Sequence, residues 1–424
     1  MSARRGTVYP LVLVLGASVV PRVSLGQSPA SDSVTLPATR FTAAYTSTWV
    51  NNVAGGVTQG SVVQSAALLE MEIALKRLAG WRGATLFASL LGAAGPSPDP
   101  LVGDLQGVLT THAPPGLRME EAWLEQDMLQ NHLSVLIGRY DMNSEFYRIQ
   151  SSAIFFNSSF GLGAELGLSG AEGPSTYPFT ALGARLAYKP TRNSVFRFAV
   201  FDGIPVDRPS GGVHPFASGD GAFAIGELAI LARPDSAAVL HERRFRIGRG
   251  PPRPYASKLA IGMWGYTTAL PDLVDTLANG SPVIHQRSEG AYLIADGLLW
   301  HSPGNATELA LFGQLGIGDP AVNVVGGFAG VGIAVTGPFA QRQNDQLGLG
   351  LASAQISSRY RRAQNAAGAP TSSPETAIEL TYLANLTTWL GVHADLQYII
   401  QPGGSLALAS SFVPALQMAV AREF

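Results

Sequence analysis

Apolar and polar residues alternate along many segments of the chain, as expected for β-strands whose two faces meet different surroundings. In each segment aliphatic or aromatic residues recur at even spacing, and polar residues such as Glu70, Ser134 and Glu379 lie between them. The apolar positions are Leu69, Met71, Ile73 and Leu75; Leu133, Val135 and Ile137; Leu309, Leu311, Leu315 and Ile317; Ile378, Leu380, Tyr382 and Leu386; and Val392, Ala394, Leu396, Tyr398 and Ile400.

The last ten residues continue this pattern. Leu416, Met418 and Val420 share one face with the final aromatic residue, Phe424, and Arg422 occupies an apolar position of that face. A terminal aromatic residue on an apolar strand face is the assembly signal of outer-membrane barrels. The C-terminal segment therefore indicates a bacterial outer-membrane protein that contacts the barrel assembly machinery through Phe424.

The segment Pro320 to Ala340 contains no charged residue, so it is either one more strand or a membrane helix. Its many glycines disfavour a helix. Apolar residues fall at even spacing along one face, and we therefore expect a barrel strand. These residues are Val325, Ala329, Val331, Ile333 and Val335.

The N-terminus has the features of a cleaved signal peptide over residues 1–26. Arg4 and Arg5 precede a short apolar stretch, Val8 to Val20, and Ser24-Leu25-Gly26 offers small residues for cleavage. The alternative is a membrane anchor, but the stretch is shorter than the roughly 20 residues that a spanning helix needs. Residues 27–40 lack periodicity and predict a flexible lead-in, followed by a single barrel domain over residues 41–424.

One apolar and one polar face per strand is typical of a transmembrane barrel, in which the apolar face contacts lipid. The alternative is a soluble β-sandwich, whose apolar face would point into a core. The N-terminal and C-terminal features and the number of segments favour the barrel. We therefore predict an all-β protein, a transmembrane antiparallel β-barrel of about 16 strands. A barrel of this size leaves room for an aqueous channel. Stretches rich in turn residues mark loops at 92–103, 112–116, 202–221, 243–254 and 363–374.

The composition and the absence of known catalytic motifs argue against several classes of function. The chain has no cysteine, only 14% charged residues and a formal net charge of −2, without a polybasic run. Nucleic acid is therefore not an expected partner. The G-x-S-x-G, H-E-x-x-H and P-loop motifs are absent, and the seven histidines are scattered. We expect no catalytic residues, no cofactor and no metal site.

The segment Glu121 to Gln126 offers candidate binding residues. If Ala122 and Leu124 face lipid, then Glu121, Trp123 and Glu125 face the lumen. An indole stacks on the C–H face of a sugar ring, and carboxylates accept hydrogen bonds from its hydroxyls. Alternatively, Trp123 belongs to the aromatic girdle. Further candidates are Arg139 and Asp141 at a strand end, which could line the mouth or form a structural ion pair, and Arg118.

The chain resembles the carbohydrate-selective porin family of the OprB type. The resemblance lies in a series of short matches in a common order. They are Leu78-Ala79-Gly80-Trp81, Gly83-Ala84-Thr85, Gly103-Asp104-Leu105-Gln106, Ala122-Trp123-Leu124-Glu125-Gln126, Ile137-Gly138-Arg139 with Asp141, Phe156-Asn157-Ser158-Ser159, Phe201-Asp202-Gly203, Gly337-Pro338-Phe339, Asp345-Gln346-Leu347-Gly348-Leu349-Gly350, Glu379-Leu380-Thr381-Tyr382, Thr388-Trp389, and Gln397-Tyr398-Ile399-Ile400-Gln401-Pro402-Gly403-Gly404.

The resemblance implies a 16-stranded outer-membrane barrel with a charged constriction through which sugars diffuse. We therefore expect a passive channel for carbohydrates with a weak sugar-binding constriction, whose partners are sugars in transit and membrane lipid. The alternatives are a general or non-sugar porin, an outer-membrane enzyme such as a lipase, and an adhesin or structural barrel without an open pore.

Overall fold

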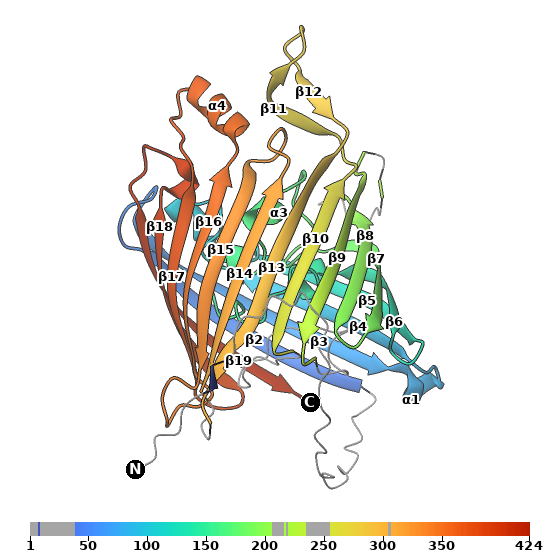
Figure 1. Cartoon of the computed structure of the whole chain (residues 1–424). Helices are drawn as coiled ribbons and strands as arrows, with labels where there is room; N and C mark the ends of the chain where they lie inside the picture. Colours follow the sequence, from blue (N-terminus) through green and yellow to red (C-terminus); the bar gives the residue numbers. More distant parts are fainter. Residues whose placement is uncertain (1–6, 9–38, 206–215, 218, 235–254, 304–306) are drawn as a thin grey trace.

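The computed structural model is a closed antiparallel β-barrel of 16 strands (Figure 1). It describes residues 7–8, 39–205, 216–217, 219–234, 255–303 and 307–424. The wall consists of β2 (Thr39–Asn52), β3 (Gly60–Ala74), β4 (Ala84–Ala94), β5 (Gly116–Met128), β6 (Leu133–Tyr140), β7 (Ala181–Thr191), β8 (Ser194–Asp202), β9 (Ala222–Ala232), β10 (Ser257–Tyr266), β13 (Ser288–His301), β14 (Glu308–Gly318), β15 (Val325–Thr336), β16 (Gln346–Ile356), β17 (Glu375–Asn385), β18 (Leu390–Ile400) and β19 (Ser411–Glu423).

Each wall strand pairs with the next one along the chain, and β19 closes the barrel against β2. The closing register runs from Ala415 opposite Val50 to Glu423 opposite Thr42. Closure pairs every wall strand on both sides, which a lipid environment requires because it offers no hydrogen-bond partners. The predicted all-β barrel of about 16 strands is confirmed.

The predicted alternation gives each strand an outward apolar face. Leu380 is 45% exposed on the outside, whereas its neighbour Glu379 is fully buried inside. On the last strand Leu416 is 49% exposed and Gln417 only 6%. The exposed aliphatic side chains therefore form the surface that contacts lipid.

Three apolar positions depart from the expected pattern. Leu75 is not in a strand, because it begins the short helix α1 (Leu75–Ala79). Leu386 lies beyond the end of β17. Val325 is 1% exposed, because a β-bulge between Val325 and Gly327 shifts the register of β15 before the outward positions Val331 and Ile333.

The two ends of the barrel differ. Several of the described connections at one end are short, such as residues 192–193, whereas described connections at the other end include longer loops with additional elements. Those elements include the hairpin of β11 (Leu270–Thr276) and β12 (Pro282–His285), and helix α4 (Ser358–Ala366). Short turns face the periplasm and long loops face the exterior in barrels of this type. The hairpin and α4 therefore belong to the outer rim.

A charged cluster joins this hairpin to α4. The guanidinium of Arg359 lies 3.0 Å from Asp272 and 2.7 Å from Asp275, and His285 Nε2 lies 2.8 Å from Asp272. Burial alone would raise the pKa of Asp272. The backbone amides of Asp275 and Val274, together with His285 and Arg359, outweigh burial and lower this pKa to about 2.

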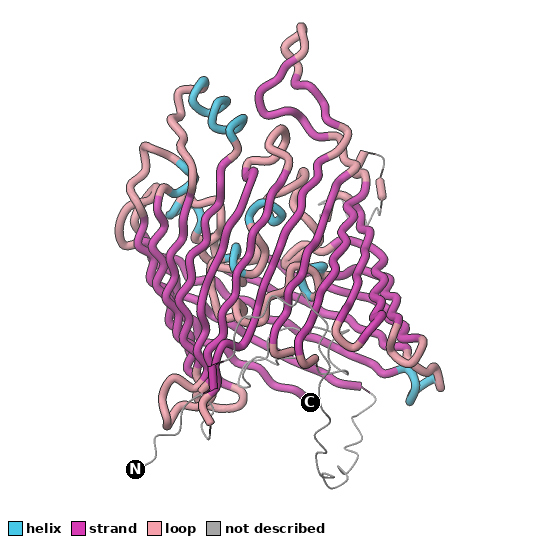
Figure 2. Tube along the Cα trace, in the orientation of Figure 1, coloured by secondary structure: helices cyan, strands magenta, loops and turns pink. Residues whose placement is uncertain are grey.

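Two of the fully described connections fold back into the barrel (Figure 2). The first inward loop, residues 95–115, contains α2 (Asp99–Val102). The second inward loop, residues 141–180, contains η1 (Met142–Ser144), η2 (Ser158–Phe160) and α3 (Ala164–Gly167). A short helix η3 (Pro402–Gly404) precedes β19. Phe146, Phe160 and Leu166 of the second loop are fully buried, so this loop forms a packed core inside the barrel.

Most of the expected signal peptide and lead-in lies outside the described residues. Thr7 and Val8 form β1 (Thr7–Val8) against Trp300 and His301 of β13. The wall itself begins at Thr39, slightly before the expected start at residue 41. The predicted loop 243–254 also lies outside the described part. None of the described helices has the length and hydrophobicity needed to cross a membrane.

Candidate functional site in the barrel interior

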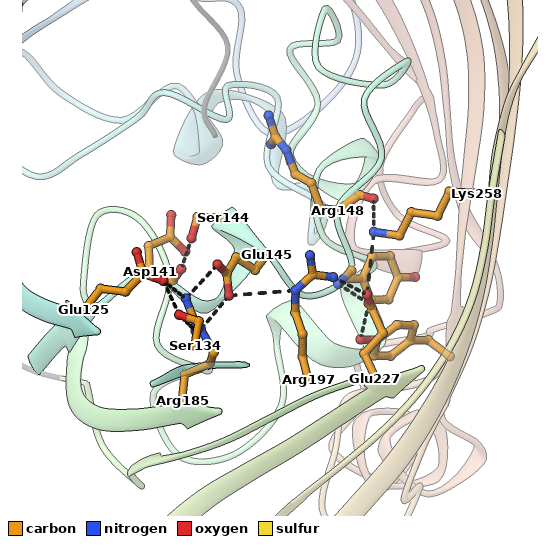
Figure 3. A network of polar contacts seen from close by, with 12 residues as sticks. Glu125, Ser134, Asp141, Ser144, Glu145, Arg148, Arg185, Arg197, Glu227 and Lys258 are labelled. Carbon is orange, nitrogen blue, oxygen red and sulfur yellow. Dashed lines mark hydrogen bonds and ion pairs between the residues drawn. The ribbon is translucent and has the colours of Figure 1, made fainter. Parts of the chain in front are cut away.

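Six charged side chains of alternating sign form a continuous network in the barrel interior (Figure 3). Arg185 of β7 contacts Glu125 of β5 at 2.6 Å and Glu145 of the second inward loop at 2.8 Å. Arg197 of β8 lies 3.9 Å from Glu145 and 3.5 Å from Glu227 of β9. Lys258 of β10 also belongs to the network and lies 3.5 Å from Glu227.

All six side chains are nearly inaccessible to water. Buried charges are tolerated only when they are paired and hydrogen-bonded. Ser134 completes one end by donating to Glu125 at 2.6 Å and accepting from Arg185 at 2.7 Å. The Tyr147 amide and the Tyr292 hydroxyl complete the other end by donating to Glu227. The network therefore holds the second inward loop against β5 to β10.

Carboxylates on β13 and β17 bind the inward loops through backbone amides. Asp296 of β13 accepts from the Gln150 amide at 2.8 Å, and Glu379 of β17 accepts from the Asn157 amide at 2.9 Å. Glu375 of β17 accepts from the Leu105 amide of the first inward loop at 2.8 Å. Each acid satisfies loop N–H groups that would otherwise be buried without a partner.

The first inward loop carries its own acidic group next to Glu375. Burial, with the nearby charges of Glu375 and Asp99, raises the pKa of Asp104 well above its usual value. Burial also lowers the pKa of His112, with a smaller contribution from Arg118.

Trp123 lies on the inward face of β5, as its alternation with Ala122 and Leu124 predicts. Its indole stacks on Phe87 of β4, with ring centroids 4.9 Å apart and planes inclined by 17°. Its Nε1 donates to Glu121 at 3.1 Å. The indole is half-buried, so part of its surface stays accessible.

Glu121 and Glu125 also point inward, and each is 4% exposed. Glu121 accepts from Trp123 and from the Asp141 amide, whereas Glu125 binds Arg185 and Ser134. Their carboxylates therefore contact protein groups in this structure. Their expected role as sugar acceptors stays a prediction.

The other three candidates lie near the junction of the two inward loops. Arg139 Nε donates to Thr180 at 2.9 Å. Asp141 begins the second inward loop and accepts from the Asn143 amide at 2.9 Å. Arg118 donates to the Pro114 carbonyl, and its guanidinium carbon lies 5.0 Å from the centre of the Phe179 ring. Whether any of them contacts solute stays a prediction.

Sequence reasoning missed most of the charged network. Each of the missed strand residues is a lone charge: Arg185 and Arg197 lie between apolar neighbours, and Glu227 and Lys258 each precede a leucine. A charge on the face opposite an aliphatic row is the signal that would have found them. Glu120 was missed for another reason. A β-bulge opposite Ser89 and Leu90 turns both Glu120 and Glu121 inward.

Within the described ranges, no group of three or more histidines or acidic residues is arranged to hold a metal ion.

The sequence matches a known protein family over most of its length. The profile of the carbohydrate-selective porin, OprB family, matches residues 63–421. Porin B of Pseudomonas aeruginosa is 23% identical over 323 residues, which cover 71% of this chain and 67% of that protein. The putative porin QuiX of Acinetobacter baylyi is 22% identical over 404 residues, covering 89% and 88% respectively.

Among solved structures, the high-pH structure of Pseudomonas putida OprB superposes with a TM-score of 0.77. It is 19% identical, and the match covers 91% of this chain and 94% of that one. The low-pH structure of the same protein gives a TM-score of 0.53 at 15% identity, covering 90% of this chain and 92% of the other. These structures share the barrel fold with this chain.

Proposed function

Because the chain belongs to the carbohydrate-selective porin family of the OprB type, we propose that it is a passive diffusion channel for carbohydrates. Its location is the bacterial outer membrane, which matches the closed barrel and its apolar outer face. Family membership favours a channel over an enzyme. Membrane lipid surrounds the barrel, and sugars are the solutes in transit.

The observation that carries this proposal is the fixed second inward loop. A 16-stranded barrel leaves an aqueous channel when its interior is empty. Here the charged network and the wall carboxylates hold that loop inside the barrel. The loop thus narrows the lumen, and a narrowed lumen selects solutes by size and by the chemistry of its lining.

We place a weak sugar site at the partly accessible indole of Trp123. Phe87 supports one face of the ring, and Glu121 orients it through Nε1. Glu125 pairs with Arg185, and the Asp141 amide donates to the same Glu121 carboxylate as the indole. Arg118 and Arg139 are further candidates of this proposal. Stacking on an aromatic ring suits the C–H face of a sugar. Binding must be weak, because a tight site would retain its solute.

The proposal also includes how the chain is exported and inserted into the membrane. Residues 1–26 act as a signal peptide, residues 27–40 as a lead-in, and the rest of the chain as one barrel domain. The barrel assembly machinery recognises Phe424.

The test is solute uptake by liposomes that contain the purified protein. Swelling rates are compared for monosaccharides and for neutral amino acids of similar mass. A sugar channel passes the monosaccharides faster than the size-matched amino acids. Equal rates at equal size would instead indicate a general porin and reject carbohydrate selectivity. No swelling with any solute would reject the channel itself.

A further inference from the structure

Glu165 lies in α3 of the second inward loop and is fully buried against the barrel wall. The helix packs on β14 and β15. Glycines make room for the carboxylate. A Cβ atom on Gly316 of β14 would lie 1.9 Å from Glu165 Oε1, and one on Gly163 would lie 2.3 Å from Oε2. The carboxyl group therefore fills a space that only glycine leaves open.

Among the residues that the structure describes, no cation acts on the Glu165 carboxyl group, and β15, on which α3 packs, carries no charged residue. The titratable group that faces the Glu165 carboxyl group is the Tyr147 hydroxyl of the same loop. The backbone amides of Glu165 and Leu166 face it as well. From the wall, β14 presents Gly316 and Gly318, and β10 presents Trp264 next to Gly318. Neither carboxylate oxygen of Glu165 makes a hydrogen bond of normal geometry.

Glu145 of the same loop differs from Glu165 because it has a cationic partner. Its carboxylate is also buried, but Arg185 contacts it at 2.8 Å. A buried carboxylate without a cation is unstable when ionised, whereas a neutral carboxyl group is tolerated at the same place. Burial accordingly raises the pKa of Glu165 to about 7.

We propose that Glu165 is a proton-dependent anchor of the second inward loop. Its neutral carboxyl group keeps α3 seated on β14. Loss of the proton to solvent creates an unpaired buried anion, so α3 leaves the wall and enters the lumen. The channel then closes more often. The seated state is favoured at low pH and is lost as pH rises through neutrality. The inference rests on the proposed channel, but not on its selectivity for sugars.

The test is single-channel current of the full-length protein in planar bilayers between pH 5 and pH 9. The wild type is expected to show more closures as pH rises, with a midpoint near pH 7. Glu165→Gln, which is neutral at every pH, is expected to remove this dependence. Glu289→Gln, which changes an exposed carboxylate of β13, is the matched control and retains it. A flat wild-type profile would overturn the proposal, and so would a Glu165→Gln variant with the wild-type midpoint.

A second variant, Gly316→Ala, keeps the proposal testable if Glu165→Gln does not fold. Gly316→Ala places a methyl group on the carboxylate, so the group must move and its midpoint must shift. Infrared absorption of the protonated carboxyl group, titrated in wild type and Gly316→Ala, measures this without any ion current. An unchanged midpoint in Gly316→Ala would contradict the inference. Neither the current recording nor the infrared titration depends on sugar uptake. If the liposome test rejects carbohydrate selectivity, both measurements still test the role of Glu165.

Discussion

Arg185 and Glu145 join the barrel wall to the second inward loop through two parallel contacts. Nε of the arginine lies 2.8 Å from Oε2 of the glutamate, and Nη2 donates to Oε1 at 3.0 Å. This side-on pairing fixes direction as well as distance. Arg185 also binds Glu125, so one guanidinium sets the distance between the loop and β5.

Replacing Arg185 should destabilise the protein strongly. Arg185→Met leaves Glu125 and Glu145 buried with less compensating charge, and breaking a buried pair costs about 3–5 kcal/mol. We expect a lower midpoint of denaturant unfolding in detergent, followed by tryptophan fluorescence. Adding Glu125→Gln and Glu145→Gln should recover part of the loss.

The control for this prediction is Arg192→Met, on the exposed turn between β7 and β8. An exposed arginine contributes little, so this variant should unfold like wild type. Equal stability of Arg185→Met and Arg192→Met would show that the network does not hold the loop.

Lipid and lumen faces should respond differently to a charge. Leu380 lies near the middle of β17 and points outward, so Leu380→Arg should cost about 2–4 kcal/mol. Thr46 lies on the half-buried inward face of β2, and Thr46→Arg should be tolerated. Refolding yield into lipid vesicles measures both variants. A similar yield for the two would contradict the assigned faces.

Trp123 should govern block of the ion current by sugar. Trp123→Ala removes the stacking surface, and aromatic stacking contributes about 0.5–1.5 kcal/mol, so binding should weaken roughly two- to twelvefold. Trp123→Phe keeps a ring and should retain most of the block. The measurement is sugar-dependent current noise in a planar bilayer. Full block in Trp123→Ala would place the sugar site elsewhere.

The contact between the rim hairpin and α4 should weaken in strong acid. The pKa of Asp272 is lowered to about 2 in the fold, so its stabilising contribution is complete above the ordinary value near 4 and is lost as pH falls through 2. Hydrogen exchange of residues 270–285, corrected for intrinsic rates, should therefore be faster at pH 2 than at pH 5. Equal protection at both values would argue against this contact.

Deleting Phe424 should reduce assembly in the outer membrane. The ring is 67% exposed, and its amide donates to the Phe41 carbonyl at 2.9 Å. Arg422, on the same face, places its guanidinium carbon 5.5 Å from the ring centre. Phe424→Tyr keeps an aromatic terminus and serves as the control. Normal amounts of the deletion variant in outer-membrane fractions would refute the proposed role of Phe424.

The barrel could be predicted because a two-residue period is a local property. Alternation alone assigned Leu380 to the outside and Thr381 to the inside, and both assignments are correct. It could not predict that Thr381 lies beneath the second inward loop and donates to the Ile154 carbonyl. That contact joins residues more than two hundred positions apart.

The interior was harder to predict because its loops lack periodicity. Trp123 was placed on the correct face, but the neighbouring bulge at Glu120 was not foreseen, since a bulge depends on the partner strand. The pairing of Glu125 with Arg185 likewise requires knowledge of which strands are neighbours. Lone charges in apolar strands were visible in the sequence, whereas their partners were not.

The attachment of the inward loops also dictates an order of events during biogenesis. The amide of Asn157 finds its acceptor on Glu379, and that of Leu105 finds its acceptor on Glu375. Both acceptors belong to β17, which leaves the ribosome long after the loops do. Until β17 joins the wall, these amides lack their final partners, and contacts over such separations form slowly. The inward loops therefore reach their final positions in the lumen only as the barrel closes. A barrel that has not yet closed would select solutes poorly.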